Sequence, residues 1–163
     1  MFYWALLNLA PSQKYSLAAI QLLAVCKYSV FKNNLELTKE ILGDFIDDLN
    51  LLQEKKMVLS INKKNVSLKG YLVSCLGDTP AQNWLGGYKE TVSLAKKFCR
   101  MCEITQESRN NFISENIRLR TLENHLKLLE ILEKEKNEKK KEELSTEFGI
   151  NFRSPLLGID NFD

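Results

Sequence analysis

The sequence has a single histidine, and it lacks the short motifs that mark common enzyme classes. A Ser-His-Asp arrangement could be built only around His125, and neither a glycine-rich phosphate loop nor a nucleophile elbow is present. The 163 residues carry 23 basic and 21 acidic side chains, so the net charge of +2 gives no strong nucleic-acid footprint. A role on DNA must therefore rest on local features.

The sequence also lacks an apolar run long enough to cross a bilayer. Residues 1–10 are apolar, but they have no positive leader and meet Pro11 at once. We therefore expect no membrane partner and an intracellular, reduced location, because four cysteines come without a secretory signal: Cys26, Cys75, Cys99 and Cys102. The 44% content of apolar residues is enough to build a folded core.

The first half of the chain alternates between strand and helix patterns. Residues 2–7 form a short apolar run that indicates a buried strand, and residues 19–27 form a second run that we assign to a strand, although its Leu and Ala residues would also suit a helix. Apolar residues at helical spacing from Leu35 to Leu52 then predict an amphipathic helix, with Asn34 as its N-cap.

A β-hairpin pattern follows this helix. Residues 58–61 and 66–68 alternate around a polar turn, and we expect the second strand to continue until Asp78. Pro80 fits the first turn of a helix, where its missing N–H group has no cost, and a Gly-Gly pair then interrupts that helix.

Helical spacing resumes over residues 91–98 and again from about residue 119 to 132. The second of these helices runs into a Lys/Glu stretch, residues 133–143, which we assign to solvent because its charges cancel. An apolar tail ends the chain with nothing in the sequence to cover it. A chain that opens on a strand and ends this way suggests a piece cut from a longer parent.

Asp78 is the first candidate for chemistry. Carboxylates at strand ends are the ligands that two-metal phosphoryl-transfer sites use, and the adjacent Gly77 leaves room for a metal ion. An aspartate before Thr79 and Pro80 is equally a turn or helix-capping residue, and spacing alone favours that interpretation.

Cys99 and Cys102 form a Cys-x-x-Cys pair, and His125 follows on a predicted helix. Zn²⁺ prefers four tetrahedral sulfur or nitrogen ligands, so these three residues form a partial zinc set. Inert thiols are the main alternative, and a redox pair is a second one, although the thioredoxin-like context for it is missing. Cys26 and Cys75 lie in apolar runs typical of small buried side chains, so a fourth ligand is not evident.

Basic residues surround the cysteine pair and could contact DNA phosphates. The nearest are Lys96, Lys97 and Arg100, and three more arginines follow at positions 109, 118 and 120. Solvated charge on a helix face is the plainer interpretation for each residue taken singly.

Several stretches together resemble transposases of eukaryotic cut-and-paste DNA elements, most closely the CACTA (En/Spm-like) group. Each stretch is short, but their order and spacing are specific, and they run through nearly the whole chain: residues 2–9, 20–24, 68–70, 77–81, 85–90, 98–102, 119–123, 148–150 and 154–157.

The resemblance implies an RNase H-like core with a DDE/D site that binds Mg²⁺, in which Asp78 is the second catalytic aspartate. It also implies a zinc-binding insertion that holds Cys99, Cys102 and His125, DNA as a partner, a nuclear location and a homo-oligomeric parent enzyme. The family's first aspartate belongs before Phe2 and its third acidic residue after Asp163. We therefore expect no catalysis by this chain alone.

We thus expect an α/β fold, namely a partial RNase H-like core with a mixed sheet, a packed helix and a helical Cys/His insertion. Residues 1–98 would form the core, 99–145 the insertion, and 146–163 a tail that leads into a missing part. The expected function is that of a transposase-derived fragment of a DNA-cleaving and strand-transfer core. The alternatives are a non-enzymatic zinc-stabilised module that binds DNA or protein, and a scaffold whose Lys/Glu helix pairs with another helix.

Overall fold

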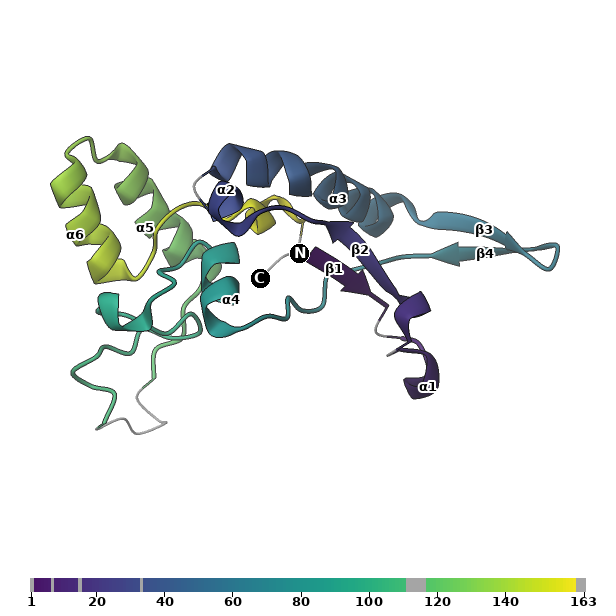
Figure 1. Cartoon of the computed structure of the whole chain (residues 1–163), viewed down its shortest axis with the longest axis horizontal. Coiled ribbons are helices and arrows are strands. Elements are labelled where there is room, and N and C mark those ends of the chain that lie inside the picture. Colours follow the sequence, from purple (N-terminus) through teal and green to yellow (C-terminus); the bar gives the residue numbers. More distant parts are fainter. Residues whose placement is uncertain (1, 7, 15, 33, 111–116, 161–163) are drawn as a thin grey trace. The chain divides into compact units, whose positions relative to one another are not determined.

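Helices and short antiparallel strands alternate along the chain, which confirms the mixed α/β class (Figure 1). The computed structural model describes residues 2–6, 8–14, 16–32, 34–110 and 117–160. These residues fall into two compact units, Met1–Phe45 and Ile46–Asp163. In the described residues the strands form two separate two-stranded sheets, so the expected mixed sheet is not observed and the RNase H-like core stays a prediction.

The first unit contains the strand pair β1 (Phe2–Ala5) and β2 (Ile20–Ala24), which is antiparallel. The helix α1 (Pro11–Lys14) and the 3-10 turn η1 (Leu17–Ala19) connect the two strands. Both strands were predicted, but the expectation that the first is buried is wrong, since Tyr3 and Trp4 are 55% and 40% exposed. Burial on both faces needs a larger sheet than two strands provide.

The long helix α3 (Leu35–Lys55) begins where the sequence predicted. The side chain of Asn34 accepts a hydrogen bond from the N–H group of Leu37 at 2.9 Å, which confirms Asn34 as the N-cap. The short helix α2 (Tyr28–Lys32) precedes α3 and places Phe31 against Phe2 of β1, with 4.9 Å between the ring centroids. Because α3 crosses residue 45, it contributes to both compact units.

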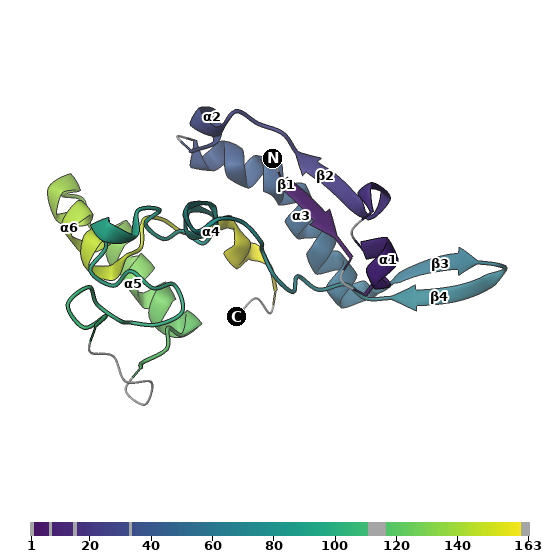
Figure 2. The same cartoon turned by 60° about the horizontal axis from the view of Figure 1, so that its bottom comes forward.

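The second unit begins with the predicted hairpin, β3 (Met57–Ile61) and β4 (Lys64–Leu68) (Figure 2). Its two turn residues, Asn62 and Lys63, have φ angles of 50° and 61°, as a type I′ turn requires.

The predicted continuation of the second strand to Asp78 is wrong, since no regular element covers residues 69–78. A strand needs a hydrogen-bonded neighbour, and no described strand pairs with this segment. At Gly70 the chain instead passes directly against the side chain of Leu52, where a Cβ atom would overlap it.

The rest of the second unit is helical and irregular. It contains α4 (Thr79–Leu85), the 3-10 turn η2 (Val92–Leu94), α5 (Leu122–Lys134), α6 (Glu138–Phe148) and the 3-10 turn η4 (Pro155–Gly158). The helix α4 ends at Gly86 as predicted, whereas the helix expected over residues 91–98 is reduced to η2. The Lys/Glu stretch contains the end of α5 and the start of α6, which begins where the side chain of Asn137 accepts a hydrogen bond from the N–H group of Lys140.

The apolar tail is covered, contrary to the expectation from the sequence. Ile150, Leu156 and Ile159 are 0%, 7% and 5% exposed, and Ile150 packs in one cluster with Leu129 and Leu132 of α5. The N–H group of Asn151 donates to the carbonyl oxygen of Gly87 at 2.7 Å. The tail therefore closes the core of the second unit.

The hairpin turn offers a test of this geometry. A non-glycine residue in the left-handed region costs about 1–2 kcal/mol, so Lys63→Gly should raise the local stability of the hairpin by about 1 kcal/mol. Slower hydrogen exchange of the β3 and β4 amides would show this. Lys64→Gly is the matched control, because residue 64 lies within β4 and should lose stability there. Faster exchange in Lys63→Gly would contradict the turn assignment.

Candidate metal centre around Cys99 and Cys102

The Cys99–Cys102 turn is held by backbone hydrogen bonds on both sides. Lys97 forms an isolated antiparallel β-bridge with Thr105, and Cys102 forms another with Leu119. The N–H group of Glu103 donates to the carbonyl oxygen of Arg118 at 2.9 Å, and that of Arg120 donates to Met101 at 3.0 Å. This irregular ladder fixes the turn beside the segment that leads into α5.

The two thiols lie close enough to share a hydrogen bond, and their acidities differ. Burial acts to raise the pKa of Cys99, but hydrogen bonds from the Cys102 thiol and the N–H groups of Met101 and Cys102, together with Arg120, bring that pKa below its ordinary value. The Met101 N–H group is 3.4 Å from Cys99 Sγ. Burial and the nearby Cys99 raise the pKa of Cys102, despite a hydrogen bond from the Ile104 N–H group. The turn therefore favours a thiolate at Cys99.

Arg120 ties this turn to the end of α6. Its guanidinium donates to three backbone oxygens, those of Cys99 at 2.8 Å, Lys97 at 2.9 Å and Phe148 at 2.8 Å. The guanidinium carbon also lies 5.4 Å from the centroid of the Tyr88 ring, within the range of a cation–π contact. One side chain thus joins three segments that are distant in the sequence.

His125 is buried in the first turns of α5 and is 7% exposed. Its Nδ1 has no hydrogen-bond partner among the described residues. Burial, with the charges of Arg120 and Arg153, lowers the pKa of His125 from 6.5 to about 4. The imidazole is therefore neutral at pH 7, which is the form that binds metal ions.

Tyr88 packs beside this histidine. Its ring centroid is 5.2 Å from that of His125. Burial raises the pKa of Tyr88; Cys99 adds to this rise, while Arg120 and Arg100 oppose it. In the described part of the chain, no group of three or more His, Cys, Asp or Glu side chains is arranged to hold a metal ion. The structure thus brings Cys99 and Cys102 together and leaves His125 outside their group.

The donor types nevertheless fit zinc. A thiol pair with a lowered first pKa and a neutral imidazole with a buried, unpartnered nitrogen are the sulfur and nitrogen donors that Zn²⁺ prefers. A buried polar atom without a partner costs about 1–3 kcal/mol, and a bound metal ion would remove that cost at His125 Nδ1.

Asp78 lies apart from this centre and caps a helix. The residue is exposed, and its Oδ1 accepts a hydrogen bond from the N–H group of Ala81 at 2.9 Å at the start of α4. It follows an irregular segment and not the predicted strand. The structure therefore gives Asp78 a capping role, and its role as a Mg²⁺ ligand stays a prediction.

The three basic residues predicted to contact DNA lie around the cysteine turn, each with a protein partner. Lys96 pairs with Glu147 at 2.7 Å, Lys97 pairs with Glu103 at 3.3 Å, and Arg100 Nη1 donates to Asn83 at 3.4 Å. The hydrogen bond with Glu147 raises the pKa of Lys96. Their contact with phosphates stays a prediction.

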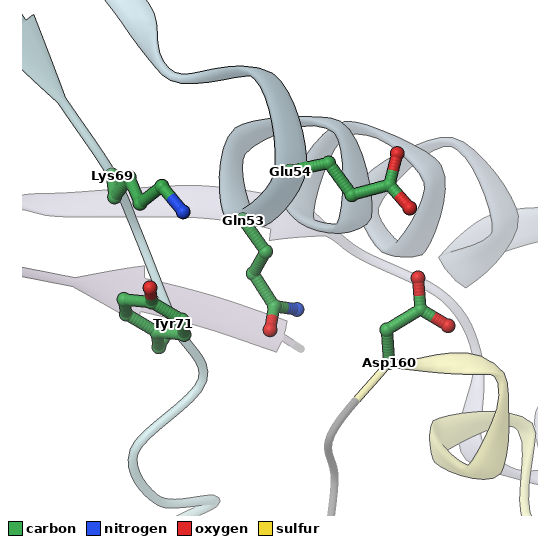
Figure 3. Close-up of a pocket in the computed structure, with 5 residues that line it drawn as sticks. All are labelled: Gln53, Glu54, Lys69, Tyr71 and Asp160. Atoms are coloured by element: carbon green, nitrogen blue, oxygen red, sulfur yellow. The ribbon is translucent and has the colours of Figure 1, made fainter.

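A separate open cavity of about 460 Å³ lies at the C-terminal end of α3 (Figure 3). Side chains from α3, from the segment after β4 and from the segment after η4 line it: Gln53, Glu54, Lys69, Tyr71 and Asp160. Nothing in the sequence predicted this cavity, because its residues come from three distant segments and form no motif.

Comparison with known proteins gives no match to any protein-family model, curated protein or solved structure. Among the described helices, none is both long and apolar enough to cross a membrane.

The sequence places Arg120 among the arginines that could contact phosphates, and it gives no sign of the three hydrogen bonds that Arg120 donates to backbone oxygens. Arg118 and Arg120 flank the same leucine, so the sequence does not distinguish them. The structure does, because the Arg118 side chain is 76% exposed and reaches Glu103 only at 3.9 Å.

This difference predicts unequal effects of the same substitution. Arg120→Met should lower the free energy of unfolding by about 3 kcal/mol, since three carbonyl oxygens lose a charged donor. Arg118→Met, the matched control, should change it by less than about 0.5 kcal/mol. Urea unfolding of both variants measures the two values, and equal losses would contradict the assigned role of Arg120.

The pKa of His125 also predicts a pH dependence of the metal-free protein. The pKa of His125 is about 4 in the folded chain and 6.5 as an ordinary value. The free energy of unfolding therefore does not depend on this group above pH 6.5, and it falls as the pH drops from 6.5 towards 4. The unfolded chain binds the proton more tightly in this window, so the loss is at most about 3 kcal/mol. Unfolding in chelator at several pH values should show less of this loss in His125→Phe. An identical pH profile would contradict a buried neutral histidine.

Proposed function

We propose that this chain is a transposase-derived, zinc-stabilised DNA-binding module that does not cleave DNA by itself. The observation that carries the proposal is the Cys99–Cys102 turn, where backbone N–H groups and the neighbouring thiol favour a Cys99 thiolate. The transposase ancestry, with its RNase H-like core and nuclear location, is supported by the ordered sequence stretches described above.

Cys99 and Cys102 would hold the zinc ion with His125, which the described arrangement does not group with the thiols. A bound Zn²⁺ supplies a cross-link between its ligands and no redox chemistry. Hydrogen bonds to Cys99, one of them from Cys102, favour the thiolate that binds zinc. Burial keeps the imidazole of His125 neutral, which is the form that binds a metal ion. The buried Nδ1 of His125 on α5 has no hydrogen-bond partner among the described residues, so it is available as a metal ligand.

The proposal assigns no catalytic step to Asp78. Two-metal cleavage requires several carboxylates that clamp two ions, and one oxygen of Asp78 already accepts the hydrogen bond that starts α4. Asp78 as a Mg²⁺ ligand and homo-oligomer formation would belong to the complete parent enzyme.

Metal analysis of the purified, reduced protein tests the zinc site. We expect about one zinc ion per chain, with near-complete loss in Cys99→Ser and in Cys102→Ser because a hydroxyl is a poor zinc ligand. Cys75→Ser is the matched control, since Cys75 is a partly buried cysteine away from the turn, and it should keep its zinc.

A chelator titration gives the opposing outcome. If zinc stabilises the module, then removing it should lower the midpoint of thermal unfolding, because metal binding adds to folding free energy. A protein that carries no zinc and unfolds identically with and without chelator would refute the zinc-stabilised module.

A further inference from the structure

The β3–β4 hairpin lies in a segment of the chain whose charged residues are all positive. Between residues 55 and 77 there are five lysines and no acidic residue: Lys55, Lys56, Lys63, Lys64 and Lys69. None of the five forms an ion pair with a described residue. The near-neutral charge of the whole chain hides this local excess, because all 21 acidic residues lie elsewhere.

The hairpin has two different faces, and all ten of its strand residues are exposed. The strand register pairs Met57 with Leu68, Leu59 with Val66 and Ile61 with Lys64, so one face is apolar except for Lys64 beside the turn. The opposite face is mainly polar, since it pairs Val58 with Ser67 and Ser60 with Asn65. Figures 1 and 2 both draw this hairpin as a two-stranded ribbon that continues from the C-terminal end of α3.

The lysines lie at the two ends of this ribbon. Lys63 and Lys64 occupy the turn and the start of β4, while Lys55 and Lys56 precede β3. Lys69 follows β4 and lines the cavity with Glu54 and Asp160 (Figure 3), so it lies at the end of the ribbon opposite the turn. The turn lysines are therefore the positions best placed for an anionic partner.

We propose that the β3–β4 hairpin is a DNA-binding ribbon, in which Ser60, Asn65 and Ser67 face a groove while Lys63 at the turn and Lys64 on the opposite face reach phosphates along the edges of that groove. This inference rests on the proposed function for the choice of DNA. A two-stranded antiparallel ribbon fits the major groove of B-DNA, and serine and asparagine side chains hydrogen-bond to base edges.

The backbone of the ribbon argues against insertion into the hydrocarbon of a membrane. Each outer edge of a two-stranded sheet carries unpaired N–H and C=O groups, which lipid cannot satisfy and a hydrated groove can. Strands of five residues are also only about 17 Å long, which is short of the hydrocarbon thickness of a bilayer.

Salt-dependent binding of the full chain to a labelled 20-base-pair duplex of random sequence tests the proposal. Each phosphate contact contributes about one unit to the slope of log affinity against log salt concentration. Lys63→Gln/Lys64→Gln should therefore reduce that slope by about two. Lys136→Gln/Lys139→Gln is the matched control, since both lysines are exposed and removed from the hairpin, and it should leave the slope unchanged.

Lys63→Gly separates charge from folding. It removes one lysine while it relieves the left-handed backbone at the turn, so the slope should fall by about one although the hairpin is more stable. Equal slope losses in the hairpin and control pairs, or none in the hairpin variants, would overturn the proposal. Binding to phosphatidylserine vesicles without binding to the duplex would also overturn it, in favour of a membrane surface.

Zinc content of the same preparations keeps the two proposals distinguishable. If the hairpin does not bind DNA, the protein can still contain one zinc ion, and the module then loses only its DNA surface. If zinc is absent while the lysine variants change the salt slope, the hairpin proposal stands and the zinc site fails.

Discussion

The hydrogen bonds of the Arg120 guanidinium organise the second unit. Its three carbonyl acceptors belong to the segment before the cysteine turn, to the turn itself and to the last residue of α6. A lysine has no planar fork and could not satisfy these acceptors in the same geometry. Arg120 therefore adds a planar, charged donor to the backbone hydrogen bonds that position the cysteine turn relative to α5 and α6.

The chemistry of the candidate centre follows from this arrangement. The positive charge of Arg120 helps to lower the pKa of Cys99 and, together with burial, that of His125. The guanidinium charge stabilises the Cys99 thiolate and destabilises a protonated His125, so the same cation lowers both pKa values. Tyr88 contacts both Arg120 and His125.

Burial is distributed unevenly between the helical and β parts of the chain. Leu129, Leu132 and Ile150 form a closed core in the second unit, whereas the strands of both sheets are largely exposed. A two-stranded sheet has marginal stability in water unless another element packs on it. The hairpin is held instead by a type I′ turn and cross-strand pairs, and the same exposure leaves both of its faces free to bind a partner.

Local patterns determined much of this structure. Spacing predicted α3 and the hairpin, Asn34 predicted the cap of α3, and Pro80 with the Gly-Gly pair predicted the limits of α4, because each depends on neighbouring residues. The separation of Cys99 and Cys102 by two residues likewise made them candidate partners from the sequence, and the two thiols do lie together. These features require only short-range geometry.

Long-range contacts decided the rest. The end of β4, the burial of Ile150 and the different roles of Arg118 and Arg120 depend on residues that are distant in the sequence. A strand pattern without a neighbouring strand does not form a strand, and an apolar tail is covered only where the fold supplies a surface. The sequence by itself determined the local elements and the donor types of the candidate centre, while the tertiary structure decided which donors meet, because burial and distance arise only from packing.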